Sequence, residues 1–205
     1  MKSYPSITKE ITEKHYIYAF DKLDGSNIRA EWNPKKGFYK FGTRTQVIDE
    51  TSKPFGFVVN LIREKFEKAL SEICISQKWE SCIFFFEVLG EDSFAGSHNY
   101  DKPFEIYLID ANPYKKGILE PKKFIELFNQ VAIPKILFEG IITEEFVESV
   151  KDGSLPEMSF EGVVCKGAST SKAKEPVMFK IKSKAWLQKL RNFCKDDEEM
   201  FKRLS

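Results

Sequence analysis

The chain has 205 residues, of which 42% are hydrophobic and 14% aromatic, so its composition excludes general disorder and predicts one folded domain, residues 1–205. Its 32 basic and 31 acidic residues leave a formal net charge of +1, so charge alone does not indicate a nucleic-acid-binding protein. No apolar run is long enough to span a bilayer, and the polar N-terminus lacks the apolar core of a signal peptide. The four cysteines are widely spaced and form no zinc-ligand pattern, which favours reduced thiols in a cytoplasmic, intracellular protein without a membrane partner.

Short segments in which apolar residues alternate with polar ones predict strands along most of the chain. In chain order they are 16–20, 28–32, 38–41, 83–89, 104–109, 162–165 and 177–181. Helical spacing of apolar residues predicts helices at 55–73, 121–130, 144–150 and 185–203. The small, polar residues 167–175 predict a loop. Hairpin-like strand pairs mixed with helices favour an α+β fold with antiparallel sheets over a doubly wound parallel sheet.

Lys22 stands where the first predicted strand runs into a turn, in the sequence YAFDKLDGSN at residues 18–27. A solvated lysine at a hairpin edge is one interpretation, because such lysines limit aggregation. Two carboxylates interrupt other apolar strands, Glu87 in FFFEVLG and Glu161 in FEGVVCKG. An unpaired carboxylate is costly to bury, so each needs a strand end or a partner.

Lys180 and Lys182 alternate with apolar residues in MFKIKSKAW and therefore point to the same face of one strand. Two ammonium groups on one face repel each other unless an anion lies between them, and phosphate is a natural candidate. If Lys22 belongs to the same cluster, its cationic neighbours disfavour its protonation and favour a free, nucleophilic amine. Together these residues indicate nucleotidyl transfer through a lysyl phosphoramidate.

Six segments resemble, in order, the motifs of the covalent nucleotidyltransferase superfamily, which includes ATP-dependent DNA ligases, RNA ligases and mRNA capping guanylyltransferases. They are KLDGSN, FGTRTQ, FFFEVLG, FEIYLIDA, FEGVVCKG and FKIKSKAW. Each motif recurs by chance in other proteins, but their shared order over residues 22–182 is specific. The resemblance implies a nucleotidyltransferase (ATP-grasp-like) domain in which two antiparallel sheets, with flanking helices, enclose the nucleotide.

The resemblance also implies roles for individual residues. Lys22 matches the lysine that becomes attached to AMP, while Lys180 and Lys182 match the lysines that contact the α-phosphate and promote its transfer. Glu161 matches the metal-associated acid. The expected nucleotide-binding residues are Asp24, Gly25, Asn27, Arg44, Glu87, Tyr107 and Ile109. Ile109 stands where the family commonly has phenylalanine, so the resemblance leaves open whether Tyr107 or Ile109 stacks on adenine.

Two features favour the nick-sealing RNA ligase branch of the superfamily. KLDGSN resembles its nucleophile motif, and KIKSKAW resembles its last motif with one residue fewer before the aromatic. Residues 183–205 are too few for a five-stranded barrel, so we expect no OB domain.

The resemblance implies an RNA-repair enzyme that uses ATP with Mg²⁺ or Mn²⁺ and forms lysyl-AMP. It transfers AMP to a 5′-phosphate and seals that end to a 3′-hydroxyl. Its expected partners are RNA ends or a nicked RNA duplex, and a separate protein in place of a C-terminal domain. The alternatives are a minimal DNA ligase, an mRNA capping guanylyltransferase, or a catalytically idle module that binds nucleic-acid ends. The presence of Lys22 and its expected partners speaks against the idle module.

Overall fold

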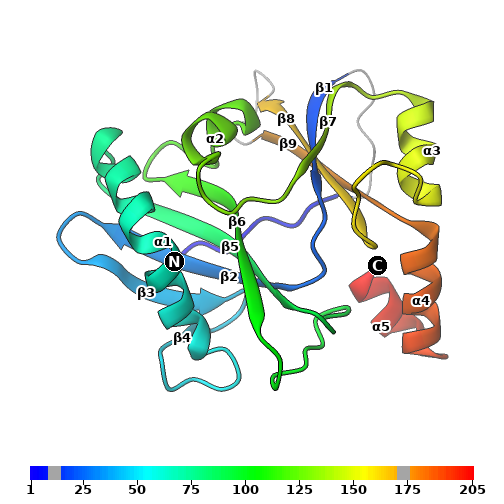
Figure 1. Cartoon of the computed structure of the whole chain (residues 1–205), viewed down its shortest axis with the longest axis horizontal. Helices are drawn as coiled ribbons and strands as arrows, with labels where there is room; N and C mark the ends of the chain where they lie inside the picture. Colours follow the sequence, from blue (N-terminus) through cyan, green and yellow to red (C-terminus); the bar gives the residue numbers. More distant parts are fainter. Residues whose placement is uncertain (9–14, 170–175) are drawn as a thin grey trace. The chain divides into compact units, whose positions relative to one another are not determined.

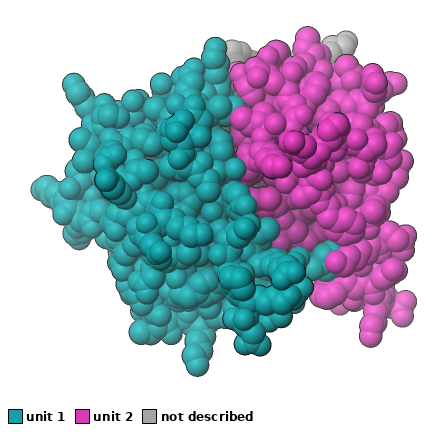
Figure 2. Space-filling view, in the orientation of Figure 1, with its two compact units in different colours: residues 1–6, 25–133, 169–176 teal, residues 7–24, 134–168, 177–205 magenta. Residues whose placement is uncertain are grey.

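The structure is a computed structural model that describes residues 1–8, 15–169 and 176–205. The chain divides into two compact units (Figure 2). Unit 1 comprises residues 1–6, 25–133 and 169–176, and unit 2 comprises residues 7–24, 134–168 and 177–205. One domain over residues 1–205 stays a prediction. Of the predicted loop at 167–175, residues 167–169 instead belong to a strand, and residues 170–175 lie outside the described residues.

Unit 1 is built on a five-stranded sheet with the order β4-β3-β2-β5-β6, in which every neighbouring pair is antiparallel (Figure 1). Its strands are β2 (Ser26–Asn33), β3 (Gly37–Thr43), β4 (Val47–Ile48), β5 (Cys82–Gly90) and β6 (Phe104–Pro113). The unit also holds α1 (Phe57–Ser76) and α2 (Pro121–Phe128).

Helix α1 packs on one face of this sheet. The rings of Phe66 on α1 and Phe86 on β5 lie 5.0 Å apart, and Trp32 Nε1 on β2 donates to Ser71 Oγ on α1 at 2.8 Å. Because successive strand residues point to opposite faces, the residues beside Phe86 and Trp32 point away from α1. Alternation therefore assigns polar side chains such as Glu87 to the face that α1 leaves open.

Unit 2 holds a four-stranded sheet with the order β7-β1-β8-β9, in which β1 pairs antiparallel with both β7 and β8. Its elements are β1 (Tyr16–Asp21), β7 (Ile136–Ile141), α3 (Glu144–Asp152), β8 (Gly162–Ser169), β9 (Pro176–Lys182), α4 (Lys184–Cys194) and α5 (Glu198–Leu204). Its core is a buried cluster of Ile17, Ala19, Phe146, Val147, Val150, Val163, Cys165, Phe179 and Ile181.

The α+β class and the two antiparallel sheets are confirmed, and so are the seven predicted strands. Two strands, β4 and β7, were not predicted from the sequence. The expected helix at 185–203 is wrong as one element, because α4 ends at Cys194 and Lys195 adopts a φ of 51°. Asp197 then caps α5 by accepting from Met200 N. No helix in the described ranges is long and apolar enough to cross a membrane.

Candidate active site

Lys22 directly follows β1, and its position is fixed by the neighbouring strand. Its backbone N–H donates to the Gly162 carbonyl at the start of β8, at 2.9 Å. Gly162 has a φ of 136°, and a Cβ on it would lie 2.1 Å from Ile181 O on β9. Only glycine allows this close approach of two backbones. The chain thereby brings Glu161, which precedes Gly162, next to the ends of β1 and β9.

The Glu161 carboxylate lies between two ammonium groups. Its Oε2 is 2.9 Å from Lys22 Nζ, and its Oε1 is 2.9 Å from Lys182 Nζ. The Glu161 side chain is 3% exposed and that of Lys182 8%, whereas the Lys22 side chain is 20% exposed. Two buried partners therefore hold a lysine whose side chain remains partly exposed. The three predicted residues form one cluster, which we call the lysine cluster.

Lys182 makes two further contacts. Its Nζ donates to Leu204 O at 2.9 Å and lies 3.6 Å from the centroid of the Trp186 ring. Burial lowers the pKa of Lys182, Glu161 opposes that shift by attraction, and the Lys22 charge adds to it by repulsion. The charge on Lys182 is thus held by a carboxylate, a carbonyl and an aromatic face.

The Asp24 side chain is held by a residue near the C-terminus of the chain. Trp186 Nε1 donates to Asp24 Oδ2 at 2.7 Å. Ser183 fixes the tryptophan, because its hydroxyl caps α4 by accepting from Trp186 N and donates to Phe160 O at 2.7 Å. The sequence pattern indicated an aromatic here, but not its bond to Asp24.

Two other lysines share the face of the sheet on which Lys182 lies. Lys180 is two residues earlier on β9, and its backbone N–H donates to Thr8 O at 2.9 Å. Lys166 on β8 alternates with the core residue Cys165, is 3% exposed and lies 4.9 Å from the Phe20 ring centroid. Lys166 was not predicted from the sequence as a member of this cationic face, because its burial leaves no signal in the sequence.

Three predicted nucleotide-binding residues of unit 1 form a row across the sheet. Asn27 on β2 is opposite Glu87 on β5, and Glu87 is opposite Tyr107 on β6. Asn27 Nδ2 donates to Phe86 O at 3.3 Å, while its buried Oδ1 accepts no hydrogen bond from the part of the chain that the structure describes. Tyr107 donates its hydroxyl proton to Glu105 at 2.8 Å. Directly opposite side chains in a sheet lie within contact distance, so the row forms one polar surface.

The remaining predicted residues of unit 1 differ in their surroundings. Arg44 is exposed just beyond β3. Ile109 lies where the β5–β6 register shifts, because Phe85 is opposite Asp110 and Phe86 is opposite Leu108. Such a bulge changes the direction of a side chain. Gly25 lies against the backbone of β5, since a Cβ on it would be 2.4 Å from Val88 O.

Arg29 is a buried cation on the same face of β2 as Asn27 that the sequence analysis missed. Its guanidinium donates to Met1 O at 2.9 Å and to Ser3 Oγ at 2.8 Å, while its Nε has no hydrogen-bond partner within residues 1–8, 15–169 and 176–205. Burial lowers the pKa of Arg29. The unused Nε leaves a donor for an anion or a carbonyl.

Tyr4 covers the neighbouring part of the sheet. Its ring lies 5.0 Å from that of Phe85, and its hydroxyl donates to Asp110. Burial and the Asp110 charge raise the pKa of Tyr4 well above its ordinary value. The N-terminal residues therefore belong to the polar face that holds the predicted nucleotide-binding side chains.

Glu161 also fits the expected role at a metal. Its buried Oε2 accepts no hydrogen bond from the described residues, although it forms the ion pair with Lys22. An unused carboxylate lone pair suits Mg²⁺ or a water bound to it. Over residues 1–8, 15–169 and 176–205 no three acidic, histidine or cysteine side chains gather, so the protein would supply few of the ligands. That is usual for Mg²⁺ in phosphoryl-transfer sites, where phosphates and waters complete the coordination.

Comparison with solved structures supports the fold. An archaeal ATP-dependent RNA ligase has a TM-score of 0.67 at 14% identity, covering 95% of this chain and 52% of that chain. A variant of Naegleria gruberi RNA ligase with ATP and Mn has a TM-score of 0.60 at 19% identity, covering 86% of this chain and 52% of that one. The same ligase with PPi has a TM-score of 0.61 at 19% identity, covering 92% and 60%.

The chain thus spans roughly half of the length of these ligases, and identities this low bear on the fold alone. The comparison with curated proteins found no match. The sequence profile of the RNA ligase family matches residues 15–182, a range that contains Lys22, Glu161 and Lys182. The chain therefore belongs to the RNA ligase family.

Proposed function

We propose that this chain is an ATP-dependent RNA ligase whose first step attaches AMP to Lys22. The observation that carries the proposal is the lysine cluster, in which Glu161 lies 2.9 Å from both Lys22 and Lys182. In this cluster Lys22 would be the nucleophile and the buried carboxylate of Glu161 would accept its proton. The second cation, Lys182, would stabilise the negative charge of the phosphate. A purely structural ion pair does not need a third charged member.

In the first step the Lys22 amine attacks the α-phosphorus of ATP, the bond to the β-phosphate oxygen breaks, and pyrophosphate leaves. The Lys22 ammonium must lose a proton before attack, and Glu161 Oε2 at 2.9 Å is an acceptor within reach. Lys182 would then exchange its contact with Leu204 for an oxygen of the α-phosphate. Lys180, on the same strand face, is proposed as the second lysine of this clamp.

Residues of unit 1 are proposed to bind the adenosine part of ATP. Glu87 would accept hydrogen bonds from the ribose hydroxyls, and Asn27 offers an unused buried oxygen beside it. Tyr107 lies opposite Glu87 and is the better candidate for stacking, because Ile109 has no aromatic ring. Arg44, which is exposed, is proposed to contact a phosphate or the ribose, while Gly25 and Asp24 would shape the backbone that follows Lys22.

A divalent cation, Mg²⁺ or Mn²⁺, would be held through Glu161 together with the ATP phosphates. When bound it would neutralise phosphate charge and orient the leaving group. The structures of Naegleria gruberi RNA ligase variants with ATP and Mn or with AMP and Mn support this assignment.

In the later steps AMP passes from Lys22 to the 5′-phosphate of an RNA strand, and a 3′-hydroxyl then displaces AMP. We propose RNA ends or a nicked RNA duplex as the substrate, in line with family membership. An intracellular, reducing compartment is supported by four buried cysteines that form no disulfide.

The test is intact-mass spectrometry of the full chain after incubation with ATP and Mg²⁺. Wild type should gain the mass of one AMP, acid treatment should remove it, and peptide mapping should locate it on Lys22. Lys22→Ala should gain no AMP while keeping its melting temperature within a few degrees. An AMP adduct that persists in Lys22→Ala would overturn the assignment.

The same experiment with other nucleotides and nucleic acids distinguishes an RNA ligase from the related enzymes. GTP should give no adduct, whereas a guanylyltransferase would prefer it. The adenylated protein should seal a nicked RNA duplex faster than the DNA duplex of the same sequence. Absence of any nucleotide adduct on a folded protein would instead favour an idle module that binds nucleic-acid ends.

A further inference from the structure

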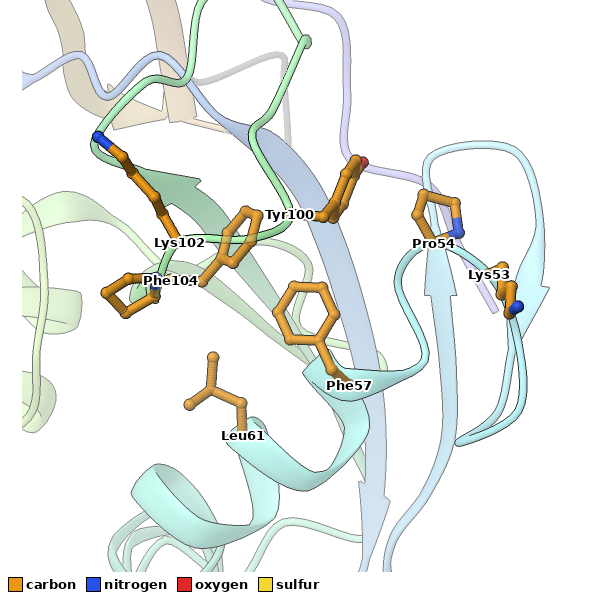
Figure 3. A pocket seen from close by; sticks show the side chains of 8 residues that line it. Lys53, Pro54, Phe57, Leu61, Tyr100, Lys102 and Phe104 are labelled. Carbon is orange, nitrogen blue, oxygen red and sulfur yellow. The ribbon is translucent and has the colours of Figure 1, made fainter.

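A cavity of about 630 Å³ opens in unit 1, at the start of α1 and beside β6. It is lined by Lys53, Pro54, Phe57, Leu61, Tyr100, Lys102, Pro103 and Phe104 (Figure 3). Its volume is in the range of ordinary small-molecule sites. None of its lining residues belongs to the lysine cluster or to the proposed adenosine-binding row.

Three aromatic residues, Phe57, Tyr100 and Phe104, line the cavity. The ring centroids of Phe57 and Phe104 lie 4.8 Å apart and those of Tyr100 and Phe104 5.6 Å apart. Tyr100 is 46% exposed and Phe57 36% exposed, so part of each of these lining residues is open to solvent. Exposed aromatic rings that already pack against each other are rigid, and a flat ligand can stack on them with little loss of side-chain entropy.

Two lysines, Lys53 and Lys102, are among the residues that line the cavity. Lys102 is held by Glu91 and Asp92, each at 3.0 Å, so its charge is largely compensated. Lys53, on the opposite side of the cavity, forms no ion pair among the described residues. An aromatic wall with one uncompensated ammonium at its edge suits an uncharged aromatic group that is attached to a phosphate.

The wall is also connected to the nucleophile motif. Tyr100 and Phe104 both contact the His98 ring, with centroids 5.9 and 5.7 Å apart. His98 Nε2 is 2.8 Å from Ser26 Oγ, and its Nδ1 is 2.6 Å from Ser93 Oγ. Ser26 belongs to the KLDGSN motif and begins β2. A ligand in the cavity would therefore contact residues that hold the segment after Lys22.

We propose that this cavity, the aromatic pocket, binds one unstacked base of the RNA strand that the enzyme joins. The proposal rests on the proposed function for the identity of the strand. A nucleobase matches the flat rings, and its 5′- or 3′-phosphate matches Lys53. Base–aromatic stacking tolerates any sequence, as a repair enzyme requires.

An apolar side chain of a partner protein is the rival occupant, and the experiment separates the two. The probe is a short, 5′-phosphorylated single-stranded RNA, with a series of the same RNA in which each member lacks one base. Affinity is measured by fluorescence anisotropy at one fixed salt concentration, because backbone contacts are salt-dependent. The proteins are wild type, Tyr100→Leu and the control Tyr114→Leu.

Tyr114 is a matched control, since it is an exposed tyrosine of unit 1 with Lys115 Nζ 4.8 Å from its ring. We expect Tyr100→Leu to bind the intact RNA about tenfold more weakly than Tyr114→Leu, which is the size of one base stack. One base-free RNA should lose about the same factor with wild type and nothing with Tyr100→Leu. That coupling identifies the base that occupies the aromatic pocket.

The proposal would be overturned if Tyr100→Leu and Tyr114→Leu bound the RNA with equal affinity. It would also be overturned if no base-free RNA lost affinity for wild type while keeping its affinity for Tyr100→Leu. Either result would favour a protein occupant or none. If Tyr100→Leu does not fold, Phe57→Leu takes its place with the same expected coupling. Both pocket variants should form the AMP adduct at the wild-type rate. Failure of wild type to form that adduct would count against the proposed function, while the RNA comparison would still decide the pocket.

Discussion

The Trp186 indole donates a hydrogen bond to the Asp24 carboxylate, 162 residues earlier in the chain. This bond ties the first turn of α4 to the segment that carries Lys22. Trp186→Phe keeps a ring beside Lys182 but removes the N–H. Because a carboxylate that loses a donor inside a protein costs about 1–3 kcal/mol, we expect stability to fall by that amount. Displacement of Asp24 should slow single-turnover adenylation about tenfold.

Trp79→Phe provides the comparison. Trp79 is also buried, but its Nε1 has no hydrogen-bond partner among the described residues, so this variant loses the same atoms without losing a bond seen in the structure. Chemical denaturation and rapid-quench adenylation measure the two effects. If both variants behave alike, the bond to Asp24 contributes nothing and only ring volume counts.

The lysine cluster predicts that stability and activity will separate in a double variant. Glu161→Gln leaves two ammonium groups facing a neutral amide, and breaking a buried ion pair from one side costs roughly 3 kcal/mol. Adding Lys182→Met removes the second buried cation, whose pKa is already lowered by burial. We therefore expect the double variant to regain part of the lost stability.

Adenylation should not recover with it. Loss of a charged contact that forms in the transition state slows a reaction by about 10²–10³, and the double variant lacks two such groups. Urea denaturation gives the stabilities, and mass spectrometry gives the rates. A double variant that is less stable than Glu161→Gln alone would contradict the repulsion between Lys22 and Lys182.

His98 predicts acid sensitivity of unit 1. Burial lowers the pKa of His98 below its ordinary value of 6.5. The His98 side chain of the unfolded chain therefore binds a proton at a higher pH than that of the folded chain. The contribution of neutral His98 to the stability of the folded state is complete above pH 6.5, and it is lost as the pH falls through the folded-state pKa. Wild type should therefore lose more stability than His98→Gln as the pH is lowered from 6.5 towards 5.

Melting curves at a series of pH values measure this difference. His15→Gln is the control for the removal of a histidine as such, because the sequence has only two histidines. Parallel curves for wild type and His98→Gln would mean that His98 takes up its proton equally well in the folded and unfolded chain.

Gly162 predicts a steric limit at the start of β8. A Cβ at this residue would lie 2.1 Å from Ile181 O and 2.9 Å from Lys182 Cα, in a backbone conformation with φ of 136°. Gly162→Ala should therefore destabilise by more than about 3 kcal/mol, beyond the 1–2 kcal/mol of a left-handed conformation alone. Gly153→Ala is the control, because its φ is 80° and nothing lies within 4 Å of a Cβ there.

Denaturation of the two glycine variants gives the comparison. Equal losses would mean that β9 shifts to make room and that the contact between Gly162 and Ile181 is not tight. A much larger loss at Gly162 would explain why glycine follows Glu161 in the motif.

The sequence predicted elements well where periodicity reports burial. Helix α1 was recognised because its buried residues, such as Val58, Ile62 and Phe66, repeat at helical spacing. Strand β7 was missed because none of its residues is fully buried, so Ile136–Ile141 shows no clear alternation. The break between α4 and α5 was missed because it depends on the positive φ of Lys195, and a lysine in the sequence does not predict that backbone conformation.

The candidate site shows the same division. Lys22, Glu161 and Lys182 stand at strand ends within short motifs, so sequence order was enough to find them. Arg29 and Lys166 were missed because a cation in an apolar strand reads as a solvent-facing residue, and only the structure shows that both are buried. The aromatic pocket was missed because its lining comes from separate segments at residues 53–61 and 100–104.

The four cysteines have a practical consequence. All are buried, and burial raises the pKa of Cys165 to about 12, so this thiol has almost no thiolate at neutral pH. Cys82 is shifted in the same direction. Because maleimides and similar reagents react with thiolates, a new cysteine placed on the surface would be labelled selectively in the otherwise native chain. One dye on each unit would then report the distance between the two units before ATP, after AMP attachment and with RNA bound.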